Sequence, residues 1–358
     1  MQMNFEVKPM PVPSAPTKIV EAYGLGKCPK LVEQICAPNL MVRVNALEVL
    51  CDEFQNPYSI EGCAREGVIT VLAEMIIDPD HITRVRASKA LWLAAKDANG
   101  LAAILDNHNT VVPLLVKGVN DPSEVVRGNV YECILAVTRT SEGIHACVRH
   151  GVTTAFVVVL RKEFSELKPV LLKTVHNIVA DETGLLEALE GRAVETCIAL
   201  LQRTSVGSHR AENEDTIIGE AARALGYMCY DGRAKKETLD QGGVEKLIAL
   251  IRDKTISVST KCSVTIALMA ISITSEGKIK VHECDGLDAI MVLLYDDSRI
   301  VLLNALKIIA NLAVYPKNRE AFLADSTCAV KLRKLSKSED SLVARHAEKA
   351  VAAVNWTP

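Results

Sequence analysis

The chain has 358 residues, of which 49% are apolar and 24% are charged, and its formal net charge is −3. This apolar content excludes a disordered chain and is enough to bury a sizeable core. The near-neutral charge and the 4% of aromatic residues argue against nucleic-acid binding, which relies on clustered cations and on rings that stack on bases.

The chain begins with a proline-bearing tail, residues 1–18, which lacks the basic start and apolar run of a signal peptide. The eleven cysteines are scattered singly, mostly inside apolar periodic stretches, and none forms a C-x-x-C pair. Buried single cysteines act as small hydrophobic residues, and this usage is typical of a reducing compartment. No apolar run approaches the roughly 20 residues of a membrane span. We therefore expect a soluble intracellular protein with no membrane contact.

From residue 19 to residue 354 the sequence repeats itself with a period of about 42 residues. One column of the repeat opens an apolar helix, with steps of 40–43 residues and one step of 52, at Gly67, Asn109, Gly151, Gly191, Gly243 and Gly286. A second column opens the next helix, at Val42, Val85, Val126, Lys168, Ile217, Val258, Val301 and Val343. Two columns with one period predict about eight structural units.

The helix of the second column carries a small residue at offset four and a branched residue at offset eight, as in Ala46/Leu50, Cys262/Ile266 and Ala305/Ile309. This spacing places both residues on one side of an α-helix and allows a neighbouring helix to approach closely. Asp-Pro and Asp/Ser turns between the helices supply N-caps. The pattern predicts an all-α fold, a right-handed α-solenoid of armadillo (ARM/HEAT-like) repeats, each with a short first helix and two longer ones.

The glycine before each second helix favours the armadillo type, because a tight bend needs a permissive backbone. We predict three segments: the tail of residues 1–18, a solenoid of residues 19–354 and a C-terminal tail of residues 355–358. The step of 52 residues has one evident cause, the polar stretch Thr204–Asp215. We expect this insertion to be an exposed loop between two helices.

Motifs for catalysis, cofactors and metals are absent. The sequence has no phosphate loop, no G-x-S-x-G elbow and no dinucleotide fingerprint. His145 and His150 are the best metal candidates, but five residues on a helix turn them about 140° apart, so they do not converge on one ion. We predict that the chain is not an enzyme and has no catalytic residue, cofactor, metal site or small-molecule substrate.

The default function of a solenoid is to bind a partner along its stacked third helices. Importin-type grooves use a Trp and Asn ladder there, but Lys173 and Lys307 stand one turn before Asn177 and Asn311, which disfavours nuclear import.

Offset one of the second column holds Arg43, Arg86 and Arg127, which at roughly 10 Å per repeat would form a basic ladder. Guanidinium groups at this spacing suit an acidic partner segment. Alternatively, these arginines pair with acids of adjacent turns, and so tie neighbouring repeats together. The candidate acids are Asp78, Asp80, Asp121 and Glu124.

Several short motifs resemble a known family. They include Ala22-Tyr23-Gly24 with Pro29-Lys30-Leu31, Asp121-Pro122 with Arg127-Gly128-Asn129, Ala267-Leu268-Met269 before Glu276-Gly277-Lys278, and Leu303-Asn304-Ala305. In order and period, between about residues 22 and 320, they resemble the radial spoke armadillo proteins of motile cilia and flagella, the family of radial spoke head protein 14 and its algal relatives.

The resemblance implies a structural role in the axoneme, as a rigid armadillo scaffold in the radial spoke that relays mechanical signals for ciliary motility. The implied partners are other radial spoke proteins, and no catalysis is implied. The alternative is a soluble cytoplasmic armadillo adaptor or chaperone cofactor that holds an extended client peptide in its groove.

Overall fold

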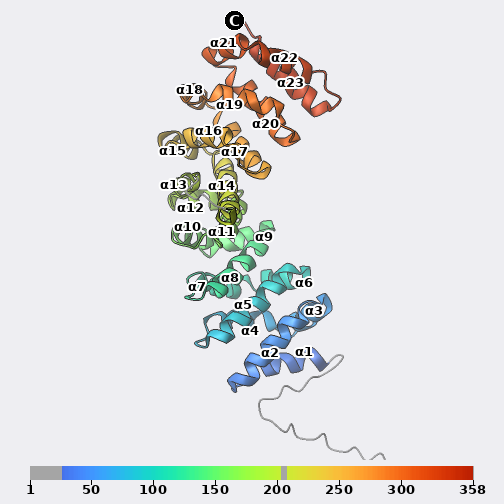
Figure 1. Ribbon diagram of the computed structural model, residues 1–358. Coiled ribbons are helices and arrows are strands. Elements are labelled where there is room, and N and C mark those ends of the chain that lie inside the picture. The colour runs from blue at the N-terminus through green and yellow to red at the C-terminus, as the bar shows by residue number, and fades with distance from the viewer. Residues whose placement is uncertain (1–25, 203–207, 358) are drawn as a thin grey trace, which may run out of the picture. The chain divides into compact units, whose positions relative to one another are not determined.

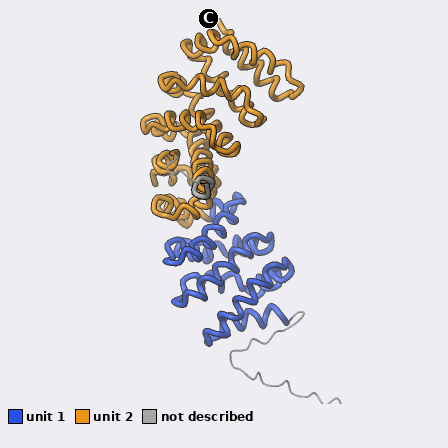
Figure 2. Tube along the Cα trace, viewed as in Figure 1, with its two compact units in different colours: residues 1–146 blue, residues 147–358 orange. Residues whose placement is uncertain are grey.

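Figure 1 shows a computed structural model of the chain, which describes residues 26–202 and 208–357. The described residues form α-helices and short 3-10 helices, with no strand among them. The chain divides into two compact units, residues 1–146 and 147–358, and the division falls within α9 (Ser141–Arg149) (Figure 2). Each unit is a stack of helical repeats, which confirms the predicted all-α solenoid.

Unit 1 stacks its repeats in chain order. The third helices α2, α5 and α8 are consecutive neighbours, α3 packs against α6, and α4 packs against α7. The helices of this unit are α1 (Lys27–Ile35), α2 (Leu40–Glu53), α3 (Pro57–Arg65), α4 (Val68–Glu74), η2 (Met75–Ile77), α5 (His81–Lys96), α6 (Ala98–Asp106), α7 (His108–Gly118) and α8 (Glu124–Val137).

Unit 2 follows the same plan. Its third helices α11, α14, α17, α20 and α23 pack in order, and Figure 1 shows α17 and α20 on one side of the unit with α15, α16 and α18 on the other. The helices are α10 (Val152–Leu160), α11 (Lys168–Ile178), α12 (Glu182–Glu190), α13 (Ala193–Leu200), α14 (Ser208–Met228), α15 (Gly232–Asp240), α16 (Gly243–Arg252), α17 (Val258–Ile271), α18 (Ser275–Glu283), α19 (Gly286–Val292), η3 (Leu293–Tyr295), α20 (Arg299–Leu312), α21 (Pro316–Ala324), α22 (Ser326–Leu335) and α23 (Ser341–Val354).

The lengths of the three helices differ from the prediction. The first helices α3, α6, α12, α15, α18 and α21 each have 9 residues. The second helices are no longer than this as a class, with 7 residues in α4 and 11 in α7. Only the third helix is long, with 14 residues in α2, α8, α17, α20 and α23. The third helices therefore provide the longest continuous surfaces of each repeat.

Side-chain caps fix where most third helices begin. Asn39, Asp80, Ser257, Ser298 and Asp340 each accept a hydrogen bond from a backbone N–H of the first turn. Counting from these caps gives the register of the repeat. Three residues after these caps, and after the N-cap residue Ser123 of α8, lies an inward position. It is buried in Thr83, Val126, Thr260, Val301 and Val343 and half-buried in Val42, in the first repeat.

In two repeats the predicted second column is displaced by two residues from the inward position. Val85 lies two positions past Thr83 and is only half-buried, whereas Val258 lies two positions before Thr260 and is 56% exposed. Thr83 and Thr260 occupy the inward position because the methyl group of threonine fills it, but an apolar pattern passes over threonine in favour of the nearest valine. In α17 the core pair is consequently Val264 and Leu268 rather than Cys262 and Ile266.

The bend between first and second helices uses left-handed backbone, although not always at the predicted glycine. Gly67 and Gly151 have φ of +78° and +74°, as expected for a residue without a Cβ. In three other repeats the left-handed residue is a neighbour of the predicted one: Arg192, Gly242 and Asp285. Gly243 and Gly286 are instead required for space, since a Cβ on either would lie 2.6 Å from the Thr238 or Ile248 side chain.

The later part of the predicted loop Thr204–Asp215 is helical, which contradicts the prediction for that part. Residues 203–207 lie outside the described residues, but α14 begins at Ser208, so the later part of the insertion extends a third helix to 21 residues. Asp215, at the end of the insertion, is buried and bonded to Thr260 and to the backbone of Ser257. The buried Asp215 carboxylate thus accepts hydrogen bonds from the start of the next third helix, so this polar residue has a structural role inside the stack.

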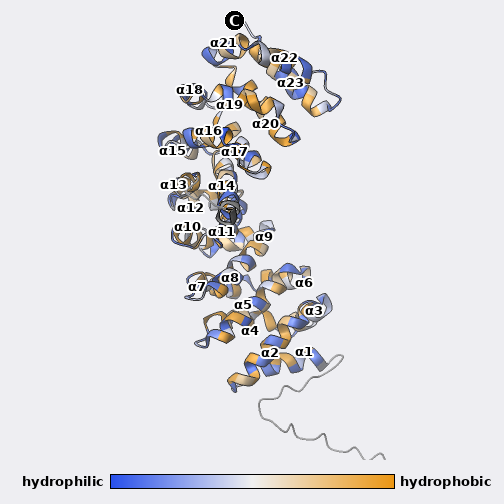
Figure 3. Cartoon of the chain, in the orientation of Figure 1, coloured by the Kyte–Doolittle hydropathy of each residue, from blue (hydrophilic) through white to orange (hydrophobic). Residues whose placement is uncertain are grey.

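The core consists of aliphatic and small residues on the inward sides of the helices, and apolar and polar residues alternate around each helix (Figure 3). Cysteine is part of this core: Cys63, Cys133, Cys147, Cys197 and Cys229 are buried, and the cysteines of the described residues are free thiols. Burial raises the pKa of the Cys147 and Cys197 thiols to about 12. These thiols therefore stay protonated and pack as small hydrophobic groups.

Candidate protein-interaction surface

Neighbouring repeats of unit 1 are joined by an aspartate that bonds in two directions. Nε of Arg84, on α5, donates to Oδ2 of Asp121 over 2.7 Å, and only 14% and 7% of these side chains is exposed. Oδ1 of the same carboxylate accepts from the backbone N–H of Ser123 at 2.8 Å. Asp121 thus shapes the turn before α8 and holds the preceding third helix at the same time.

The same device recurs, and we call it the aspartate tie. Arg43 of α2 lies 3.6 Å from Asp78, whose Oδ1 accepts from the N–H of Asp80 at 2.7 Å. In unit 2, Lys261 of α17 bonds Asp296 at 2.6 Å, and the N–H of Ser298 donates to that carboxylate at 2.9 Å. A basic residue four positions after one cap and an aspartate two positions before the next cap are the sequence signal of the tie.

The structure places the three predicted arginines at contacts within unit 1, but not in one row. Arg127 shares the position of Arg84, and its Nη1 donates to the carbonyls of Asp121 and Pro122 at 3.0 and 3.3 Å. Arg86 lies two positions further along its helix than Arg43 does, because the predicted column is displaced by two residues in that repeat. Its guanidinium donates to the Val44 carbonyl at 2.7 Å and pairs with Glu48 at 2.9 Å. Sequence reasoning missed Arg84, which shares the position of Arg43 and Arg127.

Neutral hydrogen bonds also join third helices of unit 2. Nδ2 of Asn304 donates to the Thr265 hydroxyl at 3.0 Å, and Nδ2 of Asn311 donates to the Ser272 hydroxyl at the same distance. Asn311 therefore uses its amide inside the protein. This agrees with the inference that the chain lacks the outward Asn ladder of import-type grooves.

The third helices of unit 2 also present a row of cations. Lys307 and Lys349 each lie nine positions after their caps, Ser298 and Asp340. Arg223 occupies the equivalent position of α14, and Lys173 precedes Asn177 on α11 as Lys307 precedes Asn311. We call these four residues the basic row. Ile266 is the one apolar member of this position, on α17.

An exposed apolar residue follows the end of each of four successive third helices in unit 2. Each lies two residues beyond the last residue of α14, α17, α20 or α23, with 60%, 51%, 63% and 56% of its surface exposed in chain order. We call this set the apolar rim: Tyr230, Ile273, Val314 and Trp356.

Ring contacts connect the row and the rim on α11 and α14. The rings of His176 and Tyr227 meet edge to face with centroids 4.2 Å apart, and Tyr227 meets Tyr230 at 6.3 Å. Burial and the neighbouring Arg223 guanidinium lower the pKa of His176 to about 4, so this imidazole is neutral at physiological pH. The row and the rim therefore belong to one continuous surface at this point.

The positive charge of the row is largely uncompensated. Arg223 lies 3.6 Å from Glu220, but Lys173, Lys307 and Lys349 have no ion pair with any described residue. Burial and the charges of Lys307, Lys349 and Arg345 lower the pKa of His346. Three cations thus lie close enough to affect the His346 imidazole on α23.

Other surfaces carry no catalytic arrangement. A cleft of about 840 Å³ between α15 and α18 is lined by charges of both signs, including Lys235, Asp240, Lys280 and Glu283. In the part of the chain that the structure describes, no three His, Cys, Asp or Glu side chains converge to hold a metal ion. No single described helix is both long and apolar enough to cross a membrane, although α9 and α10 would pass that test as a bent pair.

Comparisons with known proteins define the class first. No protein-family model matches the chain. An engineered protein of known structure aligns with a TM-score of 0.82 at 23% identity, covering 93% of this chain and 79% of that one. A designed armadillo repeat protein aligns with a TM-score of 0.61 at 21% identity, covering 68% and 100%, and another, solved with the peptide (KR)4, aligns with a TM-score of 0.60 at 20% identity, covering 68% and 99%. The fold is therefore an armadillo-repeat solenoid.

One curated protein is similar in sequence to part of the chain. Radial spoke protein 14 of Chlamydomonas reinhardtii is 28% identical over 147 residues, which are 40% of this chain and 38% of the algal protein. The predicted resemblance to the radial spoke armadillo proteins is confirmed by this match. The match spans less than half of the length of either protein.

Proposed function

We propose that the chain is a structural, non-catalytic scaffold of the axonemal radial spoke in motile cilia or flagella, where it binds other spoke proteins. The similarity to radial spoke protein 14 is the single observation that carries this proposal. The three aspartate ties support it, because each joins one repeat to the next and such links suit a load-bearing element.

Fractionation of ciliated cells that express the tagged full-length chain tests the proposal. We expect the protein to stay with detergent-extracted axonemes and to be released only by strong salt, together with the other spoke proteins. A soluble cytosolic protein serves as the control for complete extraction. Release of the tagged chain by detergent alone would contradict an axonemal role.

The second candidate is a soluble adaptor or assembly cofactor that binds an extended client segment. The basic row beside the apolar rim favours this function, because its lysines have no ion pair within the described residues and such a surface needs no axoneme to bind a segment. Recovery of the chain in the detergent-soluble fraction, together with retained peptide binding, would support the adaptor over the scaffold.

The partner-binding role of Arg43, Arg86 and Arg127 stays a prediction. Arg43 and Arg86 bind acceptors of a neighbouring repeat, which supports the alternative that they tie repeats together. Arg127 donates to carbonyls of the turn before its own helix. Both roles are compatible with a scaffold. They differ in what a substitution does to binding and to melting.

A further inference from the structure

We infer that the third-helix surface of unit 2 binds an acidic, amphipathic segment of a partner protein, with carboxylates on the basic row and apolar side chains on the apolar rim. The inference deepens the proposed binding function and rests on it, because it assigns that function a surface and a class of partner. It does not depend on where in the cell the partner lies.

The first step is the charge of the basic row. Lys173, Lys307 and Lys349 have no ion pair within the described residues, and the cation of Arg345 adds to the positive field near Lys349. Lys173 and Arg223 lie on adjacent third helices, as do Lys307 and Lys349, and like charges repel one another at roughly 10 Å from one third helix to the next. A partner that supplies carboxylates at that spacing removes the repulsion and gains charge-assisted hydrogen bonds.

The second step is the exposure of the apolar rim. A single exposed apolar residue on a protein surface needs no explanation, but four at one position of four successive repeats form a patterned strip. Tyr230 and Trp356 are the residue types that dominate binding energy at interfaces. A cation also lies beside the apolar rim, since the Arg319 guanidinium is 4.9 Å from the Trp356 ring centroid.

The third step is the spacing between row and rim. In three repeats a rim residue follows a row residue by seven positions: Tyr230 follows Arg223, Val314 follows Lys307 and Trp356 follows Lys349. The row residue lies inside its third helix and the rim residue lies two residues past the end of that helix, so the two sets occupy different levels along the third helices. A partner segment lying across the third helices would therefore meet charge along one edge and apolar surface along the other.

This chemistry distinguishes the partner from that of the designed relative solved with (KR)4, a basic peptide. A basic segment would meet like charges along the row. A nucleic acid would satisfy the cations, but it would leave the aliphatic members of the rim without an apolar partner. Only an acidic segment that also carries apolar side chains complements both features.

The experiment measures binding of the full-length chain to fluorescent synthetic peptides. The probe peptide combines glutamate and leucine on opposite edges, and its controls replace either every glutamate by lysine or every leucine by serine. We expect the probe to bind and both control peptides to bind at least about tenfold more weakly. A single-stranded oligonucleotide is the non-peptide polyanion, and tighter binding of the oligonucleotide would overturn the inference.

Two sets of variants locate the site. The row variant combines Lys173→Glu, Lys307→Glu and Lys349→Glu, and its control makes the same charge change at exposed lysines elsewhere, with Lys89→Glu, Lys117→Glu and Lys254→Glu. The rim variant combines Ile273→Ser, Val314→Ser and Trp356→Ser, and its control combines Val292→Ser, Leu323→Ser and Val330→Ser. We expect a loss of probe binding of at least about tenfold in the row and rim variants, and less than about twofold in their controls, with melting temperatures matched within each pair.

Equal loss in a variant and its control would overturn the inference, as would probe binding that requires deletion of residues 1–18, since the occupant would then be the chain's own tail. The axonemal fractionation separates the two proposals. Unchanged probe binding by the row variant, in a chain that stays in axonemes, contradicts only the surface assigned here. Row-dependent probe binding by a chain that detergent releases contradicts only the spoke role.

Discussion

Unit 1 and unit 2 share one backbone plan, but they use the charges of their third helices differently. In unit 1, Arg43, Arg84 and Arg86 all bind acceptors of a neighbouring repeat, through a carboxylate or a backbone carbonyl. In unit 2, Lys261 forms an aspartate tie with Asp296 and Arg299 pairs with Asp340. Amide–hydroxyl bonds join third helices in both units, Asn129 to Ser88 in unit 1 and Asn304 to Thr265 in unit 2. The difference is that the lysines of the basic row have no ion pair within the described residues of unit 2.

The outward positions follow the same division. Nine positions after the cap, unit 1 alternates in sign with Glu48, Lys89 and Glu132, whereas unit 2 carries the basic row. Sixteen positions after the cap, unit 1 has Gln55, Lys96 and Arg139, whereas unit 2 carries the apolar rim. Charges that are paired within a unit stabilise its stacking, and charges that remain unpaired are available to a partner. The repeat plan is common, so function is to be sought where the two units differ.

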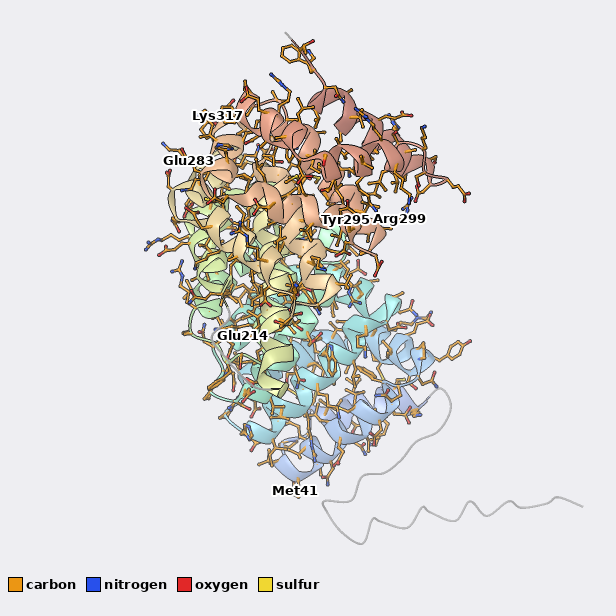
Figure 4. All side chains as sticks on the ribbon, turned by 45° about the horizontal axis from the view of Figure 1, so that its top comes forward. Met41, Glu214, Glu283, Tyr295, Arg299 and Lys317 are labelled. Atoms are coloured by element: carbon orange, nitrogen blue, oxygen red, sulfur yellow. The ribbon has the colours of Figure 1, made fainter. Side chains whose placement is uncertain are left out.

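Breaking an aspartate tie in unit 1 should have the largest effect on stability. Asp121→Ala leaves the largely buried Arg84 guanidinium without its carboxylate and removes the acceptor of the Ser123 N–H, and we expect a loss of about 2–3 kcal/mol. Hydrogen exchange should rise first in α5 and α8. The control is Asp340→Ser, which keeps a capping side chain and removes only the exposed pair with Arg299 (labelled in Figure 4). An equal loss in both variants would show that burial of the tie does not matter.

Overpacking the third helices should cost nearly as much in either unit, which makes it a test of what the units share. Ala305 and Ala46 are both fully buried seven positions after their caps. Ala305→Leu should destabilise by about 1–3 kcal/mol, because the added volume pushes neighbouring third helices apart. Exchange should rise in α17, α20 and α23 more than elsewhere in unit 2. Exchange that rises evenly along the chain would contradict the register counted from the caps.

The sequence predicted the fold class well, because the period near 42 residues and the inward alanines can both be detected from the spacing of apolar residues alone. It placed the register less well where threonine holds the inward position. Thr83 and Thr260 are polar by composition and buried in fact, so the nearest valines attracted the pattern, and Arg86 took the place of Arg84 in the predicted row.

The apolar rim was not predicted, because the prediction used the apolar periodicity within helices and the members of the rim lie just outside the helices. Lys173 and Lys307 were noted in the sequence only because they stand where an import-type groove has tryptophan, and the basic row was not identified. Pairing decides whether a charge is structural or free, and pairing depends on which residues of the next repeat lie opposite. Periodicity within one helix does not contain that information, but the spacing of each aspartate from the next cap does.

Substituting the three predicted arginines separates tying from binding. Arg43→Lys, Arg86→Lys and Arg127→Lys together keep the charge but lose the forked geometry that reaches carbonyls and carboxylates at once. For the tying role we expect a loss of about 1 kcal/mol, with axonemal retention and acidic-peptide binding unchanged. The matched control converts the exposed Arg65, Arg192 and Arg233 to lysine. Weaker retention at an unchanged melting temperature would instead support the partner-binding role.

The smallest expected effect is a difference in pH dependence between the units. His176 of unit 2 has a pKa of about 4 in the folded chain, caused by burial and by Arg223, against about 6.5 for an unfolded histidine. Between these values the unfolded state binds more protons, so stability falls as the pH drops from about 6.5 towards 4 and is unaffected above this window. The ring is only partly shielded from water, so we expect less than about 1 kcal/mol at pH 5. His176→Asn should flatten this part of the urea-denaturation profile measured from pH 7.5 to 5, whereas His81→Asn, at an exposed site of unit 1, should leave it unchanged. Parallel profiles for all three proteins would show that the His176 ring titrates equally in the folded and unfolded states, and that the contact with Arg223 has no effect on it.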